Sequence, residues 1–271
     1  MDVKKQDLLT VIGLVTAIAL MILGMLGGSS LTIFYDPFSI AITVGGSVGA
    51  LLVSYPMKEI KRLGKVIVET FKEETTSKVD TITLFTNLSR KARREGLLSL
   101  EDDITNIEDE FTRKALNMVV DGIEPEAIKE IMQLEIVELE KRHEDGSAML
   151  KSLGAYGPAF GMLGTLIGLI QMLADMNDAA NLTKGMGKAL ITTFYGSILA
   201  NIIAIPMAQK LDYKTAQEVN SMEMIIEGVI AIQSGVNPRI VEDKLSAYLS
   251  PSERAEIKAM GVNNNEVAEN V

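Results

Sequence analysis

Four long runs of apolar residues divide an otherwise charged chain. They cover residues 8–28, 38–55, 152–174 and 189–209, and none contains Asp, Glu, Lys, Arg or His. A helix needs roughly 20 apolar residues to cross a bilayer core of about 30 Å, and it satisfies its own backbone hydrogen bonds in lipid. The pattern therefore predicts four transmembrane helices. The first run is too long for a signal-peptide core, so we expect it to be retained.

Helical periodicity continues in the charged segments. Two amphipathic stripes have this spacing: Ile60, Leu63, Ile67 and Phe71, and further on Ile104, Ile107, Phe111 and Ala115. Such stripes predict helices that need a partner surface. Helix breaks are expected at Gly122 and Gly235, and Pro125 suits the first turn of the next helix. A short helix is expected over 238–249.

These patterns predict an all-α integral membrane protein with five regions. Residues 1–55 hold transmembrane helices one and two, and residues 56–151 form a helical cytoplasmic region. Residues 152–210 hold transmembrane helices three and four, and 211–258 form C-terminal cytoplasmic helices. The polar segment 259–271 is expected to be a disordered tail.

Basic residues predict the orientation of these helices. They gather before helix one, after helix two, before helix three and after helix four: Lys4, Lys5, Lys58, Lys61, Arg62, Lys65, Lys141, Arg142, Lys151, Lys210 and Lys214. The short loops expected at 29–37 and 175–188 hold only Lys184 and Lys188. Because cytoplasmic loops carry the excess of Lys and Arg, both termini and the middle segment are predicted to be cytoplasmic.

Composition narrows the possible chemistry. The mean hydropathy is +0.22 although 23% of the residues are charged, which fits apolar segments in lipid and charged segments in water. The net charge of −10 argues against a nucleic-acid partner. Cys is absent and His143 is the one His, so a thiolate or His-rich metal site cannot be assembled. We therefore expect no enzyme activity, metal or cofactor, and assign His143 no role.

Glycines in the third run have the spacing by which membrane helices approach closely. Two such pairs are present, Gly157 with Gly161 and Gly164 with Gly168. The segment is not a dinucleotide-binding loop, because it lies inside a membrane run and follows no strand. Plain helix packing and a thin helix wall beside a moving partner both fit the pattern.

The third and fourth runs also carry polar residues. Thr193, Ser197 and Asn201 recur every four residues, and Thr165 lies in the third run. A lone membrane Thr often bonds only its own helix. Three polar residues in register instead favour a helix that lines a narrow, partly wet ion path.

Pro158 and Pro206 lie inside the third and fourth predicted helices. Each removes a backbone hydrogen bond and is expected to kink its helix. Proline is common in membrane helices, so the kinks can be ordinary packing features. The functional alternative is a pair of hinges that couples the membrane helices to the cytoplasmic region.

The missing ionisable residues in the four runs are informative. Ion-moving proteins usually place an ionisable group at membrane depth. If this chain moves ions, a second polypeptide must therefore supply the carboxylate.

A basic cluster and an acidic cluster follow each other in the middle segment. The basic cluster is Arg90, Lys91, Arg93 and Arg94, and the acidic cluster is Glu101, Asp102 and Asp103. The clusters lie too far from the second membrane run to be orientation signals. They are either a solvated face with local ion pairs or a docking surface for a fast, reversible partner.

The chain resembles a known family, the MotA/PomA subunits of the bacterial flagellar stator. The segments that carry the resemblance are ARREGLLSLEDD (92–103), VDGIEPEAIK (120–129), GAYGPAFGMLGTLIGLI (154–170), TTFYGSILANIIAIPMA (192–208) and EGVIAIQSGVNPRIVE (227–242). Together they extend the resemblance to about Tyr248.

The resemblance implies a homo-pentameric ring around the helices of a MotB-type dimer, which supplies the membrane Asp. It also implies that ion flow across the bacterial inner membrane drives torque on the rotor protein FliG. The family's rotor-contact residues fall on Arg93 and Glu101, with Arg90 and Arg94 as accessories. Its membrane prolines fall on Pro158 and Pro206, and its channel-lining threonines fall on Thr165, Thr192 and Thr193.

Two other functions and two ions remain open. One alternative is a TolQ/ExbB-type energiser, which has helices similar to the third and fourth runs of this chain. Such proteins typically have three membrane helices, whereas four are predicted here. A passive membrane scaffold would need no acidic partner. The three threonines resemble the sodium-driven PomA branch and slightly favour Na⁺, a hard cation that needs several oxygen ligands. Proton-driven members of the family can keep the same residues.

Overall fold

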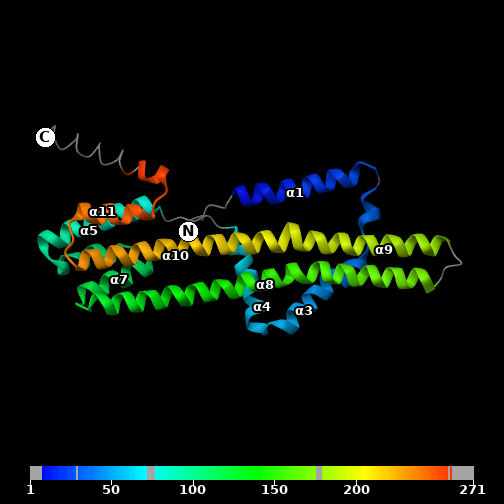
Figure 1. The fold of residues 1–271 in the computed structure, drawn as a ribbon, viewed down its shortest axis with the longest axis horizontal. Coiled ribbons are helices and arrows are strands. Elements are labelled where there is room, and N and C mark those ends of the chain that lie inside the picture. The colour runs from blue at the N-terminus through cyan, green and yellow to red at the C-terminus, as the bar shows by residue number, and fades with distance from the viewer. Residues whose placement is uncertain (1–7, 29, 72–76, 175–178, 256, 258–271) are drawn as a thin grey trace. The chain divides into compact units, whose positions relative to one another are not determined.

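The computed structural model describes residues 8–28, 30–71, 77–174, 179–255 and 257, and every regular element in this part of the chain is a helix (Figure 1). These residues form two compact units. Unit 1 contains residues 1–73 and 142–214, and unit 2 contains 74–141 and 215–271. The tail predicted at 259–271 lies outside the described residues.

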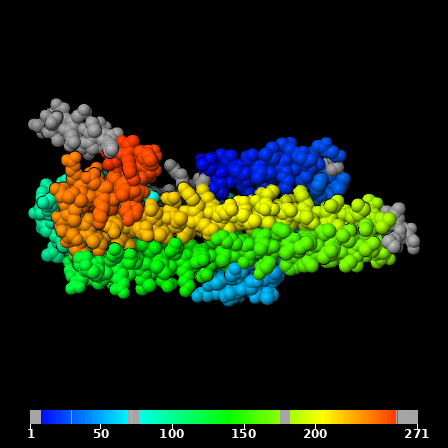
Figure 2. All heavy atoms as spheres, in the orientation of Figure 1, coloured from blue at the N-terminus to red at the C-terminus, as the bar shows by residue number. Residues whose placement is uncertain are grey.

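Unit 1 holds the apolar helices. Its elements are α1 (Leu8–Leu26), η1 (Leu31–Phe34), α2 (Pro37–Ile40), the π-helical turn η2 (Ala41–Gly45), α3 (Gly46–Ser54), α4 (Met57–Thr70), residues 142–174 of α8 (Pro125–Ala174), α9 (Ala179–Ile198), the π-helical turn η4 (Leu199–Ala204) and residues 205–214 of α10 (Ile205–Gln233). The α8 and α9 segments run side by side, as Figures 1 and 2 show.

Four helical stretches of the described chain are long and apolar enough to cross a membrane. They are Leu8–Leu26, Leu31–Ser54, Pro125–Ala174 and Leu182–Gln233. Each covers all or nearly all of one of the apolar runs of the sequence. The loop predicted at 175–188 is wrong for most of its length, because α9 already begins at Ala179. Lys184 and Lys188 end the apolar run, but they do not prevent helix formation.

The amphipathic stripe of α4 packs within unit 1. Leu63, Ile67 and Phe71 cover a small buried cluster that contains Leu150 of α8 and Met207 of α10. This contact explains why α4 belongs to the same compact unit as the apolar helices, although its sequence is charged.

Unit 2 is a separate helical body. Its elements are α5 (Lys78–Glu95), η3 (Leu97–Leu100), α6 (Glu101–Thr105), α7 (Glu110–Val120), residues 125–141 of α8, residues 215–233 of α10, α11 (Pro238–Leu245) and η5 (Ser246–Tyr248). The core of the unit includes Phe85, Leu116, Ile128 and Val229, all fully buried. A Cβ on Gly228 would lie 2.6 Å from the Phe85 ring, so the core requires glycine there.

The predicted helix ends in unit 2 are confirmed. Gly122 and Gly235 have φ of 74° and 66°, a left-handed conformation that suits glycine after a helix. Pro125 opens α8. The predicted stripe over 104–115 is buried but is not one helix. Asp109 caps the start of α7, because its Oδ2 accepts a hydrogen bond from the Thr112 amide at 2.8 Å.

Candidate functional site

The first candidate site begins with a close contact between α8 and α9. The carbonyl oxygen of Gly157 lies 2.5 Å from the position that a Cβ would take on Gly196. A Cβ on Gly161 would lie 3.0 Å from the carbonyl oxygen of Thr192. The two backbones therefore meet with no room for a side chain, which confirms the packing predicted from the glycine spacing.

Two of the predicted ion-path threonines meet beside this contact. The hydroxyls of Thr165 and Thr193 share a hydrogen bond of 2.6 Å, and Thr165 Oγ1 also donates to the Ala189 carbonyl at 2.9 Å. Thr193 is exposed and Thr165 is half-buried. The pair thus presents hydroxyl oxygens on an accessible face of unit 1.

Thr192 is buried beneath that face. It is 1% exposed, its hydroxyl donates to the Ala189 carbonyl at 2.9 Å, and its own carbonyl accepts a hydrogen bond from Thr43 at 3.3 Å. Successive residues of a helix point about 100° apart, so Thr192 packs against the helix of η2 while Thr193 does not. The structure nevertheless brings Thr192 together with the other two predicted threonines, because the hydroxyls of Thr165, Thr192 and Thr193 all lie within hydrogen-bond distance of the Ala189 carbonyl.

The second apolar stretch contributes buried hydroxyls that sequence analysis missed. Ser39, Thr43 and Ser47 are at most 1% exposed, and Ser47 Oγ donates to the Thr43 carbonyl at 2.6 Å. Their spacing of four residues was a readable signal. They form a polar seam inside unit 1, on the side of α9 that carries Thr192.

The remaining stripe residues continue along α9 and η4. Ser197 and Asn201 are exposed, and Asn201 Nδ2 donates to the Ser197 carbonyl at 3.1 Å. Asn201 also lines a groove of ≈ 330 Å³ between α1 and the start of α10. The polar face therefore runs from Thr193 to this groove.

Both predicted coupling prolines are exposed and lie at helical positions. Pro158 lies within the unbroken helix α8. Pro206 is the second residue of α10, which directly follows the π-helical turn η4. A π-helical turn inside a longer helix is often found at a functional site. The kinks themselves stay a prediction.

The second candidate site is the charged segment of unit 2. Arg90, Arg93 and Arg94 are exposed on the last turns of α5, and Glu101 is exposed on the first turn of α6. Gly96, with φ of 87°, ends α5 between them. The four predicted rotor-contact residues are thus all exposed where α5 ends and α6 begins.

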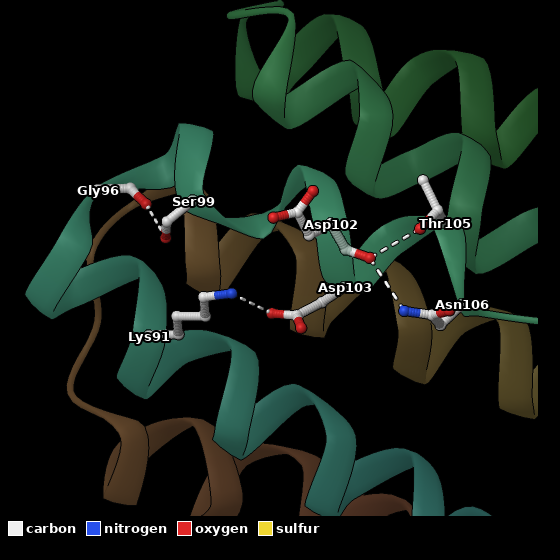
Figure 3. Close-up of polar contacts among 7 residues, drawn as sticks. All are labelled: Lys91, Gly96, Ser99, Asp102, Asp103, Thr105 and Asn106. Atoms are coloured by element: carbon white, nitrogen blue, oxygen red, sulfur yellow. Dashed lines mark hydrogen bonds and ion pairs between the residues drawn. The ribbon is translucent and has the colours of Figure 1, made fainter.

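An ion pair bridges the same two helices. Lys91 Nζ lies 2.8 Å from Asp103 Oδ2, as Figure 3 shows. The hydrogen bond to Asp103 is the main cause that raises the pKa of the Lys91 ammonium, with the charges of Asp103, Glu95 and Asp102 adding to it against desolvation. Because the folded pKa is raised, the Lys91 ammonium is charged at neutral pH, and its contribution to the pair is lost as pH rises above the ordinary pKa of Lys.

Comparison with known proteins identifies the family. Residues 11–96 match the motility protein A N-terminal family, and residues 103–224 match the MotA/TolQ/ExbB proton channel family. Motility protein A of Treponema phagedenis is 42% identical over 255 residues, which are 94% of this chain and 98% of that protein. The chain belongs to the MotA/PomA family of flagellar stator subunits. The chemotaxis protein PomA of Vibrio alginolyticus is 34% identical over 250 residues, 92% of this chain and 98% of that one.

A solved structure agrees with this membership. The flagellar MotAB stator complex from Bacillus subtilis contains a chain that is 35% identical, with a TM-score of 0.86 over 91% of this chain and 98% of that one. As a MotA/PomA family member, this chain is an inner-membrane stator subunit and not an enzyme. The match to the motility N-terminal family favours the stator subunit over the TolQ/ExbB energiser and the passive scaffold.

Proposed function

We propose that five copies of this chain form a ring around the membrane helices of a MotB-type partner and convert ion flow into torque on the rotor protein FliG. Four helices cross the inner membrane with both termini in the cytoplasm. The partner supplies the Asp that carries the ion, which is H⁺ or Na⁺. The observation that carries this proposal is the exposed polar face of α9, which offers hydroxyl oxygens in apolar runs that contain no ionisable side chain.

The polar face suits an ion path that is completed by a second protein. Thr165 and Thr193 present oxygens but no charge, and so can order water or ligate a cation beside a carboxylate. The similar structure from Bacillus subtilis is a MotAB stator complex, which supports a MotB-type partner here. Pro158 lies on α8 and Pro206 on α10, which continues α9 beyond η4, and both are the proposed coupling points.

The rotor contact is assigned to the charged end of the α5–α6 connection. Arg93 and Glu101 are exposed there. In the part of the chain that the structure describes, neither side chain forms a hydrogen bond or ion pair with another residue. Both charges are therefore available to a partner, and Arg90 and Arg94 extend the same surface.

Reversing both charges should abolish rotation without harming the fold. For Arg93→Glu with Glu101→Lys, we expect swimming speed to fall about tenfold or more, because like charges across an interface cost several kcal/mol. Membrane levels and ion flux should stay at wild-type values. Lys129→Glu, an exposed reversal elsewhere in unit 2, is the control. Loss of the protein from the membrane, or normal swimming, would contradict the rotor assignment.

The threonine pair also suggests a test of the ion. We expect swimming speed at fixed pH to rise with sodium, and Thr165→Ala to raise the sodium concentration for half-maximal speed about tenfold, since a bond to a charged group is worth about 1.5–3 kcal/mol. Thr165→Ser keeps the hydroxyl and should stay close to wild type. Swimming that ignores sodium and stops with a protonophore would identify H⁺ and leave the threonines a water-ordering role.

A further inference from the structure

Opposite charges are crowded where α5 ends and α6 begins. The basic last turns of α5 carry four cationic side chains, and the first turn of α6 carries Glu101, Asp102 and Asp103. Among the described residues, Lys91 and Asp103 are paired with each other at 2.8 Å. Arg93 and Glu101 are not paired within the described chain. One cation and one anion are therefore already paired with each other, while Arg93 and Glu101 stay available.

The Lys91 and Asp103 side chains meet beside a groove between α5 and α6. A groove of ≈ 350 Å³ separates the two helices beside the pair, and its lining includes Leu84, Leu88 and Ile107 as well as Lys91 and Asp103. Elsewhere α5 and α6 contact each other mainly through η3. The ion pair is thus a direct bridge between the helix that carries Arg93 and the helix that carries Glu101.

The acceptor end of the bridge is itself held in place. Thr105 Oγ1 and Asn106 Nδ2 both donate to the Asp102 carbonyl, at 2.7 Å and 3.1 Å, and close the short helix α6 (Figure 3). On the other side of the turn, Ser99 Oγ donates to the Gly96 carbonyl at 2.7 Å. Because these hydrogen bonds hold α6 in place, Asp103 can fix the position of α5 through its ion pair with Lys91.

We propose that the Lys91–Asp103 ion pair is a positioning pair for the rotor contact. It sets the separation between Arg93 and Glu101, and it keeps Asp103 from competing with the rotor for the arginines. This inference rests on the proposed rotor contact. Both partners are partly exposed, with side-chain exposures of 30% and 42%. Pairs of this kind contribute little to stability, so the role of the pair lies in geometry rather than in folding.

A charge-swap cycle tests the positioning role. The variants are Lys91→Asp, Asp103→Lys and the two combined, and the measurement is torque per stator unit, read from the height of the speed steps as units join a bead-loaded motor. We expect each single change to lower the step height about twofold and the combined change to restore most of it, as an interaction between two contacting residues requires. A folding defect would lower the number of steps instead.

The single variants separate geometry from net charge. Lys91→Asp makes the segment more acidic and Asp103→Lys makes it more basic, so a pure charge effect would move torque in opposite directions. A positioning pair loses torque in both. If a charge-reversal variant fails to reach the membrane, the neutral variants Lys91→Met and Asp103→Asn take its place. We expect the same loss of step height in them.

A second exposed ion pair of unit 2 is the matched control. Lys114 Nζ lies 2.7 Å from Glu135 Oε2 and joins α7 to α8, with comparable exposures of 49% and 38%. Lys114→Asp should leave the step height unchanged. Unchanged step heights in the Lys91 and Asp103 variants, opposite shifts, or a combined variant that restores nothing would overturn the proposal. Normal torque in the Arg93→Glu, Glu101→Lys variant would instead overturn the rotor contact on which it rests.

Discussion

Vesicles that contain this chain alone should conduct no more H⁺ or Na⁺ than empty vesicles. The four apolar runs contain no ionisable residue, and an isolated ion in a low-dielectric medium costs tens of kcal/mol. The hydroxyls of Thr165 and Thr193 lower that cost but supply no counter-charge. We expect flux to appear when a MotB-type partner is incorporated together with the chain, measured as the decay of an imposed ion gradient.

The same experiment identifies the charge carrier. A partner whose membrane Asp is changed to Asn should assemble with the chain but conduct as little as the chain alone. Co-purification of the two proteins is the assembly control. Robust flux from the chain alone, or from the complex with the Asn partner, would show that the ion follows a route inside this chain.

Gly196→Ala should lower the thermal stability of unit 1 markedly. The new Cβ would lie 2.5 Å from the Gly157 carbonyl oxygen, a backbone atom of α8 that cannot rotate away. Overpacking of this kind costs about 1–3 kcal/mol. Separating α8 from α9 should also pull Thr165 away from Thr193. Because the chain contains no Trp, circular dichroism of the protein in lipid is the suitable measurement.

The matched control is Gly187→Ala in the same helix. Apart from its own helix backbone, no heavy atom lies within 4 Å of a Cβ placed there. Ala is favoured over Gly in a helix by about 1 kcal/mol, so this change should leave the melting temperature equal or higher. Equal melting temperatures for the two variants would mean that the contact between Gly157 and Gly196 does not hold the helices together.

The fold follows to a large extent from local patterns in the sequence. Charge-free apolar runs, the glycines at 122 and 235, and Pro125 each act through the chemistry of neighbouring residues, and the structure has the corresponding helices and helix ends. Errors arose where a local pattern was incomplete. The stripe over 104–115 has helical spacing, yet the Asp109 cap starts a new helix inside it.

The family resemblance placed the candidate residues, but it did not give their partners. Thr192 and Thr193 are adjacent in the sequence, and the structure separates them onto a buried and an exposed face of α9. The cluster around Arg90 contains four cations, and nothing in their order shows that Lys91 is the one that pairs with Asp103. The four-residue spacing of Ser39, Thr43 and Ser47 is visible in the sequence, but their packing against α9 is not.

The sequence by itself determined which segments are helical, which of them suit a membrane, and that they carry no ionisable group. These properties depend on residues close together in the chain. The tertiary structure decided which oxygens meet at Thr165, which glycines touch across α8 and α9, and which of the charges near Arg93 are paired. Such contacts join residues far apart in the chain, and they depend on the rotation and spacing of whole helices, which no local pattern of residues specifies.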